Sequence, residues 1–234
     1  MELIIEKTIA KGGQGIICQT TFEGKKVAMK IDYKPSGKTN FSPLRTEFNY
    51  LNQFDHENIV RVYQFIAPTD AVKVILPMNK GPEFVKISEK LIKFRLENDY
   101  FVLEKRAIML LELCEDEFFE VVLSNDGISD METARDYFCQ ICRGVKALHD
   151  QGLVNYDIKL ENVLINDGKL KICDLGLSEP VNRRRMMKIG TDNAMAPEMH
   201  LGGMFGGPVV DIFSLGVLLY SMIFARFPWN HTML

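Results

Sequence analysis

The most informative stretch of this sequence is LVNYDIKLENVLI, at residues 153–165. It is a polar loop that carries Asp157 and Asn162 and then runs into an apolar segment, which predicts a strand. A second short strand is expected over Leu170–Cys173, and Asp174 follows it, twelve residues after Asn162. A hairpin between the two strands would bring the three polar side chains together. Hard oxygen ligands of this kind suit Mg²⁺, which proteins usually share with substrate phosphates.

The first third of the chain is predicted to be rich in strands. Short apolar or β-branched segments run over Leu3–Ile9, Gly15–Phe22 and Lys25–Asp32, and Glu23-Gly24 is typical of a tight hairpin turn. The stretch Lys11-Gly12-Gly13-Gln14-Gly15 joins the first two strands, and its glycines would let backbone amides approach a phosphate. The signal is weak alone, because such turns are common and this one lacks the Lys-Ser/Thr ending of a P-loop.

A lysine and a glutamate in this region form a candidate pair. Lys30 ends an apolar strand, where a lysine would usually extend its amine to water. Ser42-Pro43 is expected to open the next helix, because Ser is a good N-cap and Pro is tolerated at the first helical position. Glu47 shares a face of that helix with Leu51, next to Leu44 and Phe48. Burying a carboxylate is costly unless it is paired, so Lys30 is its expected partner.

Two further strands are predicted over Val60–Ile66 and Arg106–Leu113, with an insert of about residues 67–105 between them. This insert is longer than a hairpin needs. It contains several Pro and Gly residues and a helical-looking stretch over Ser88–Glu97. We interpret it as a solvated loop with one short helix, and a docking surface has no specific support.

The pattern becomes helical from about residue 115. Ser129 and Glu132 are typical of a capping box. Apolar residues then recur at helical spacing as far as Leu148, and Gly152 is expected to stop the helix. These features predict an α+β protein with a small β-rich lobe joined near residue 113 to a helical lobe, and a cleft between lobes is a usual place for a ligand.

The totals exclude several classes of protein. The chain has 234 residues, a net charge of −3 and five cysteines, which gives no electrostatic case for nucleic acid or a membrane surface and no sign of a disulfide framework. Glu2, Glu6 and Lys7 interrupt the N-terminal apolar residues, so a signal peptide is not expected. The apolar stretch Val209–Ala225 is short for a membrane span and carries Asp211, so a buried helix is favoured. An intracellular, cytoplasmic protein is expected.

Taken together, these motifs resemble those of the eukaryotic protein kinase family, in the family's order and over nearly the whole chain. The resemblance implies a two-lobed fold, with residues 1–113 as N-lobe and hinge and residues 114–234 as a partial C-lobe. It implies transfer of the γ-phosphate of ATP, with Mg²⁺, to a protein hydroxyl. Ala196-Pro197-Glu198 closes the activation segment, and Asp211 begins the buried helix that anchors the catalytic loop.

The resemblance also assigns roles to individual residues. Asp157, Lys159, Lys30 and Glu47 are the implied catalytic group, with Asp157 accepting the hydroxyl proton, and Asn162 and Asp174 are the implied metal ligands. The implied hinge is Glu112-Leu113-Cys114, with Leu111 behind it and Glu117 as a candidate for the ribose. The full set of implied nucleotide contacts is Ala10, Lys11, Gly12, Gly13, Gln14, Gly15, Ile17, Ala28, Lys30, Leu111, Glu112, Cys114, Glu117 and Leu164.

Lys159 and Gly190-Thr191 resemble the serine/threonine class, and the Val209–Pro228 stretch faintly resembles the calcium/calmodulin-dependent group. The chain also departs from the family pattern. Ala10 replaces the first loop glycine, and Gln14 replaces the aromatic residue at the loop tip. The chain ends soon after Pro228-Trp229, which leaves out the helices that carry the usual arginine partner of Glu198.

The sharpest departure is beside the catalytic aspartate. Asn155-Tyr156 replaces the His-Arg pair, whose arginine normally binds a phosphate on the activation segment. Residues 174–198 contain only two hydroxyl side chains, Ser178 and Thr191, and Thr191 matches a structural position. We interpret the basic residues Arg183, Arg184, Arg185 and Lys188 as a solvated charge run. The sequence therefore predicts a kinase that does not depend on activation-segment phosphorylation, with a nucleotide-binding pseudokinase or scaffold as the alternative.

Overall fold

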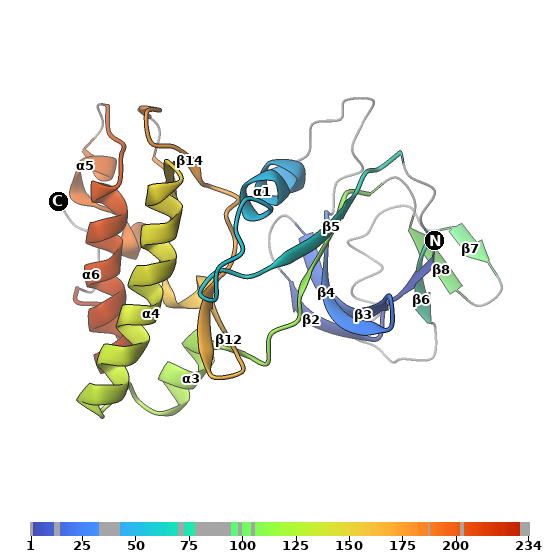
Figure 1. Cartoon of the computed structure of the whole chain (residues 1–234), viewed down its shortest axis with the longest axis horizontal. Helices are drawn as coiled ribbons and strands as arrows, with labels where there is room; N and C mark the ends of the chain where they lie inside the picture. The colour runs from blue at the N-terminus through green and yellow to red at the C-terminus, as the bar shows by residue number, and fades with distance from the viewer. Residues whose placement is uncertain are drawn as a thin grey trace. The chain divides into compact units, whose positions relative to one another are not determined.

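The computed structural model describes residues 2–11, 15–32, 43–69, 73–77, 95–97, 100–103, 106–186, 188–201 and 204–229. The chain divides into two compact units. The first comprises residues 1–52 and 61–113, and the second comprises residues 53–60 and 114–234. The chain is α+β, because strands dominate the first unit and helices dominate the second (Figure 1).

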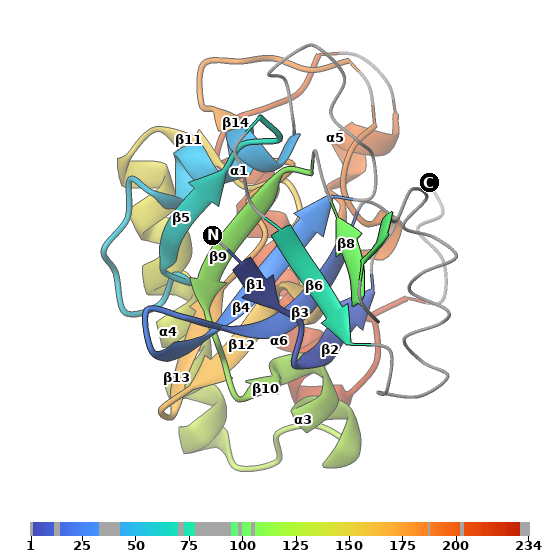
Figure 2. The ribbon, with the colours of Figure 1, turned by 90° about the vertical axis from the view of Figure 1, so that its right-hand side faces the viewer.

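The first unit contains a five-stranded antiparallel sheet in the order β2-β3-β4-β9-β5 (Figure 2). The turn between β3 and β4 has positive φ at both Glu23 (49°) and Gly24 (77°), which is the geometry of a tight type I′ hairpin turn. The strands span Lys7–Lys11 (β2), Gly15–Phe22 (β3), Lys25–Asp32 (β4), Ile108–Glu112 (β9) and Val62–Ile66 (β5).

A second sheet in this unit corrects two expectations. Its order is β1-β6-β8-β7, and β1 runs parallel to β6. The expected strand Leu3–Ile9 is broken at Ile5-Glu6, so that β1 joins this sheet and β2 joins the other. The insert is not only loop, because it supplies β6, β7 and β8. The strands span Glu2–Ile4 (β1), Lys73–Pro77 (β6), Arg95–Glu97 (β7) and Tyr100–Leu103 (β8).

The helix expected over Ser88–Glu97 is wrong at its end. Residues 95–97 form β7, which pairs with β8 through Leu96 and Phe101, whereas residues 88–94 lie outside the described residues. Cross-strand pairing outweighs the local helical pattern here, since intrinsic propensity is a weak preference that tertiary contacts override.

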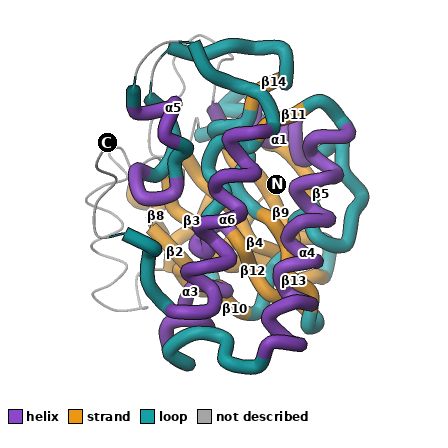
Figure 3. The backbone as a smooth tube through the Cα atoms, turned by 90° about the vertical axis from the view of Figure 1, so that its left-hand side faces the viewer, coloured by secondary structure: helices purple, strands orange, loops and turns teal. Residues whose placement is uncertain are grey.

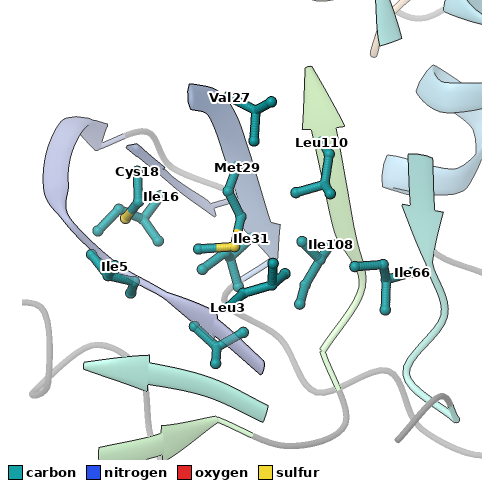
Figure 4. Packing of buried hydrophobic residues seen from close by; sticks show 11 residues of the cluster. Leu3, Ile5, Ile16, Cys18, Val27, Met29, Ile31, Ile66, Ile108 and Leu110 are labelled. Atoms are coloured by element: carbon teal, nitrogen blue, oxygen red, sulfur yellow. The ribbon is translucent and has the colours of Figure 1, made fainter. Parts of the chain in front are cut away.

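The core of the first unit joins its strands to the N-terminus. Alternate residues of β3 and β4 point inward, as the two-residue period of a strand requires. Leu3 and Val74 are each at most 1% exposed, so both β1 and the insert contribute to this core. Figure 4 shows the cluster, which comprises Leu3, Ile5, Ile16, Cys18, Val27, Met29, Ile31, Ile66, Val74, Ile108 and Leu110.

The second unit is mainly helical. Helices α4 and α6 pack against each other (Figure 3), and a three-stranded sheet β10-β12-β13 contacts α4 through β13. The strand β11 pairs with β14. The elements are α3 (Phe118–Ser124), α4 (Met131–Asp150), α5 (Pro197–His200), α6 (Val209–Phe224), β10 (Asp116–Glu117), β11 (Leu153–Val154), β12 (Val163–Asn166), β13 (Lys169–Ile172), β14 (Glu179–Pro180) and the 3₁₀ turns Leu160–Asn162 and Asp192–Ala194.

The start of α4 differs from the predicted capping box. Asp130, not Ser129, is the N-cap, and its carboxylate accepts a hydrogen bond from the backbone N–H of Thr133 at 2.9 Å. A carboxylate also interacts favourably with the positive end of the helix dipole. The predicted stop is confirmed, since the helix ends at Asp150 and Gly152 has a φ of +71°.

Residues 53–60 lie within the range expected for the N-lobe but belong to the second unit. The backbone of β13 explains why. Ile172 donates to the carbonyl of Asn58 and accepts from Val60, both at 2.9 Å. Gly144 of α4 allows this approach, because a Cβ there would lie 2.7 Å from the carbonyl oxygen of Asn58.

Helix α6 corresponds to the predicted buried helix, but only one face of it is buried, since Val209 and Ile212 are 62% and 58% exposed. Val210, Leu215, Leu218 and Met222 are all at most 6% exposed, and Asp211 is fully buried. Within the described parts of the chain, no helix has both the length and the apolar content that crossing a membrane would take.

Candidate active site

The Lys30–Glu47 pair forms as predicted. Lys30 lies in β4, opposite Ile17 of β3 and Met109 of β9. Its Nζ is 2.8 Å from both carboxylate oxygens of Glu47 in α1 (Pro43–Leu51). The two side chains are 19% and 5% exposed, so the carboxylate would be poorly solvated without the amine. Helix α1 is held against β5 by ring contact between Phe48 and Phe65, at 5.6 Å between centroids.

The other predicted nucleotide contacts of the first unit lie on neighbouring strands. Ala10 pairs with Ile17 across β2 and β3, Lys11 follows in β2, and Ala28 pairs with Leu111 across β4 and β9. Gly12, Gly13 and Gln14 lie outside the described residues. Gly15 is required on steric grounds, because a Cβ there would lie 2.3 Å from the carbonyl oxygen of Ile31.

The predicted hinge falls where the chain passes from one unit to the other, between Leu113 and Cys114. Glu112 is held in place by Arg61, since each backbone N–H bonds to the other residue at 2.9 and 3.1 Å. In the second unit, Glu117 of β10 pairs directly with Leu164 of β12. Two residues predicted to contact the nucleotide are therefore neighbours in space.

The carboxylate of Asp157 is the best-connected group of the catalytic loop. Its Oδ1 accepts from the hydroxyl of Thr191 at 2.7 Å, and its Oδ2 accepts from the amide of Asn162 at 2.9 Å. Nζ of Lys159 lies 3.0 Å from Oδ2 and donates to Thr191 at 2.6 Å. Three side chains, from the loop, the 3₁₀ turn and the activation segment, thus converge on one acid. Such a carboxylate is oriented to accept a proton from a hydroxyl.

Asp211 holds the backbone of the loop just before Asp157. Its carboxylate, at the start of α6, accepts from the backbone N–H groups of Asn155 (2.8 Å) and Tyr156 (2.9 Å). His149, which sequence reasoning missed, contacts the same carboxylate at 2.8 Å through Nε2. Tyr156 adopts a φ of +67°, an unfavourable conformation for a bulky residue that these bonds maintain. The only sequence signal for His149 is its place near the end of α4.

The two predicted metal ligands lie at the end of the β12–β13 hairpin. The backbone N–H of Cys173 donates to the carbonyl of Asn162 at 3.0 Å, which extends the ladder and places Asp174 next to Asn162 in the register. Asp174 has a φ of +59°, and its Oδ1 accepts from the N–H of Gly176 at 3.0 Å. The amide nitrogen of Asn162 is directed to Asp157, so its oxygen points elsewhere. An amide and a carboxylate oxygen at one hairpin end fit Mg²⁺.

An apolar cavity of about 200 Å³ lies beside the catalytic loop in the second unit. Ile158, Lys159 and Leu160 form one wall, and side chains of α3 and α6, among them Val122 and Leu218, form the others. The cavity therefore begins two residues or fewer from Asp157. Asp157 itself is not one of the residues that line this cavity.

The family model for the protein kinase domain matches residues 88–233. This chain belongs to the protein kinase family.

Relatives extend the similarity through the first unit of this kinase. The carbon catabolite-derepressing protein kinase of Saccharomyces cerevisiae is 29% identical over 97% of this chain and 31% of that protein. A probable serine/threonine-protein kinase of Dictyostelium discoideum is 29% identical, over 97% of this chain and 14% of that protein. The NUAK family SNF1-like kinase 1 of Mus musculus is 27% identical, over 97% and 30%. The chain thus spans a third or less of the length of these relatives.

Proposed function

We propose that this chain is an ATP-dependent protein serine/threonine kinase. The observation that carries the proposal is the set of contacts around Asp157. Thr191 orients its Oδ1, and Asn162 and Lys159 orient its Oδ2. A protein hydroxyl that approaches this carboxylate would pass its proton to it. The hydroxyl oxygen forms a bond to the γ-phosphorus as the bond from that phosphorus to the ADP oxygen breaks.

The remaining residues have supporting roles. Lys30, oriented by Glu47, would hold the α and β phosphates, and Lys159 would offset charge on the transferred group. Asn162 and Asp174 would hold Mg²⁺, which supplies positive charge to the phosphates when bound. The chain's own contribution is mainly to position the hydroxyl and the phosphates. The proposal places this reaction inside the cell, where ATP is available.

We also propose that activity does not require phosphorylation of the activation segment. Ser178 is 4% exposed, so another kinase could not reach its hydroxyl in this conformation. The hydroxyl of Thr191 is already bonded to Asp157 and Lys159. These are the two hydroxyl side chains between Asp174 and Glu198.

A nucleotide-binding pseudokinase is the second candidate. One observation favours it: Glu198 is exposed, and within the described residues it has no ion-pair partner. Such a protein would bind ATP through the first unit without transferring phosphate.

One assay separates the two functions. Transfer of labelled phosphate from ATP to a generic protein is compared for wild type, Asp157→Ala and the exposed-site control Glu132→Ala, alongside nucleotide binding. We expect Asp157→Ala to lower transfer by about 10²- to 10⁴-fold with nucleotide binding retained, and Glu132→Ala to match wild type. Nucleotide binding by wild type with transfer no greater than that of Asp157→Ala would favour the pseudokinase.

A further inference from the structure

The activation segment contains a buried carboxylate. Glu179 is 6% exposed and lies in β14, which pairs with β11 immediately before the catalytic loop. Both of its oxygens are bound by Arg185: Nε donates to Oε2 at 2.7 Å, and Nη2 donates to Oε1. A two-point contact of this kind fixes the orientation of both groups. Arg183 approaches the same carboxylate at 3.3 Å, but its side chain is 65% exposed.

Arg185 also lies over the residue that precedes the catalytic aspartate. Its guanidinium carbon is 5.9 Å from the centre of the Tyr156 ring, within the range of a cation–π contact. Tyr156 is 2% exposed, and burial raises the pKa of its hydroxyl, so the ring is a neutral partner. One side chain therefore contacts both the activation segment and the catalytic loop.

The backbone of the same arginine closes the segment against the loop before α6. Arg185 and Phe205 exchange two backbone hydrogen bonds of 2.9 Å, and Nη1 of Arg184 donates to the carbonyl of Gly206 at 2.7 Å. Gly206 leaves room for this contact, because a Cβ there would lie 2.8 Å from the carbonyl oxygen of Arg183 and 3.0 Å from the hydroxyl of Tyr156.

In the family pattern, the catalytic loop supplies an arginine at the position of Tyr156, and the activation segment supplies a phosphate. Tyr156 cannot bind a phosphate on the segment. Instead the segment itself provides the cation, Arg185, and the anion, Glu179. The contact between the activation segment and the catalytic loop therefore needs no added phosphate. This agrees with the burial of Ser178 and with the bond from the Thr191 hydroxyl to Asp157.

We propose that Arg185 is a positioning residue for phosphate transfer: it clamps Glu179 and Tyr156 together and so holds the activation segment where Thr191 meets Asp157. This inference rests on the proposed kinase activity. Arg185 does not touch the reacting atoms. It acts through Tyr156, which immediately precedes Asp157 in the chain, and through the segment that leads to Thr191.

The test uses the full chain and compares Arg185→Gln with Arg183→Gln, which removes the exposed contact to the same carboxylate. We expect Arg185→Gln to lower kcat by about 10- to 100-fold, the loss typical of a hydrogen-bonded ionic contact, with the KM for ATP unchanged. Arg183→Gln should stay within about twofold of wild type. Arg185→Lys should recover part of kcat, because it keeps the charge but not the two-point contact. Equal kcat for Arg185→Gln and Arg183→Gln would overturn the proposal.

A second measurement keeps the inference testable apart from catalysis. Hydrogen exchange over residues 153–157 and 178–186 should become faster in Arg185→Gln and stay unchanged in Arg183→Gln. Glu179→Gln added to Arg185→Gln should cost little more than Arg185→Gln alone, because both changes remove one interaction. If wild type transfers no phosphate, the proposed function fails but the exchange result still decides whether the clamp exists. Unchanged exchange in Arg185→Gln would reject the clamp, whatever the activity.

Discussion

The hydroxyl of Thr191 donates to Oδ1 of Asp157 at 2.7 Å, which ties the activation segment directly to the carboxylate that we propose as catalytic. The same hydroxyl accepts from Lys159 at 2.6 Å. A methyl group at residue 191 would leave both the acid and the amine without this partner.

We therefore expect Thr191→Ala to lower kcat/KM by about 10- to 100-fold, since a hydrogen bond to a charged group contributes about 1.5–3 kcal/mol. Thr191→Ser keeps the hydroxyl and should retain most of the activity. Steady-state kinetics with ATP and a protein substrate make the comparison. Equal activity of the two variants would show that the hydroxyl has no role in orienting Asp157.

Variants of the Lys30–Glu47 pair should affect protein stability and phosphate transfer differently. Lys30→Met should lower the free energy of unfolding by about 2 kcal/mol, because it removes the amine that contacts both oxygens of the 5%-exposed Glu47 carboxylate. Lys30→Met with Glu47→Leu should recover that stability, since both charges are gone, but should not recover phosphate transfer. Urea unfolding and the transfer assay measure the two effects. A double variant as unstable as Lys30→Met would contradict this account.

Asp211 should be the acid whose conversion to an amide affects the second unit most. Asp211→Asn replaces an oxygen that accepts from Asn155 or Tyr156 with an NH₂ group, so we expect a loss of about 3 kcal/mol in stability and a strong loss of transfer. Asp126→Asn, in an exposed turn, should change stability by less than about 0.5 kcal/mol. Thermal unfolding of both variants checks the contrast.

The N-terminal strand should be part of the stable core. Leu3 is 1% exposed and its neighbour Ile4 is 50% exposed. Leu3→Ala should therefore cost about 2–5 kcal/mol, and Ile4→Ala should cost less than about 0.5 kcal/mol. Chemical denaturation measures both. Similar values for the two would mean that β1 does not pack into the core in solution.

Cys18 should be the least reactive thiol. Burial raises its pKa from 9.0 to about 12, and the thiolate is the reactive form. At pH 8, alkylation followed by mass spectrometry should label the half-buried Cys114 and Cys139 before Cys18, and denaturant should remove the difference. Because the folded pKa is raised, the contribution of Cys18 to stability is complete below pH 9 and is lost as the pH rises toward 12. Labelling of native Cys18 at the rate of Cys114 would contradict its burial.

Several parts of this protein can be predicted from short spacings in the chain. The strands β3 and β4 and their hairpin, the stop of α4 and the paired loop–strand order around Asp157 all follow from residue types within a few positions of one another. The Lys30–Glu47 contact could be predicted as well, because a buried glutamate requires a cation and the nearby strand offered one.

Other parts depend on contacts between segments that lie far apart in the chain. The N-terminal residues pair with β6 of the insert, more than sixty residues away, and no local pattern encodes that register. The sequence favours a solvated charge run for the three consecutive arginines, but Arg185 is 26% exposed and bonded to Glu179, whereas Arg183 is 65% exposed. Neighbouring residues of one type are equivalent in sequence. Which of them turns inward depends on the path of the backbone, here fixed by the bridge between Arg185 and Phe205.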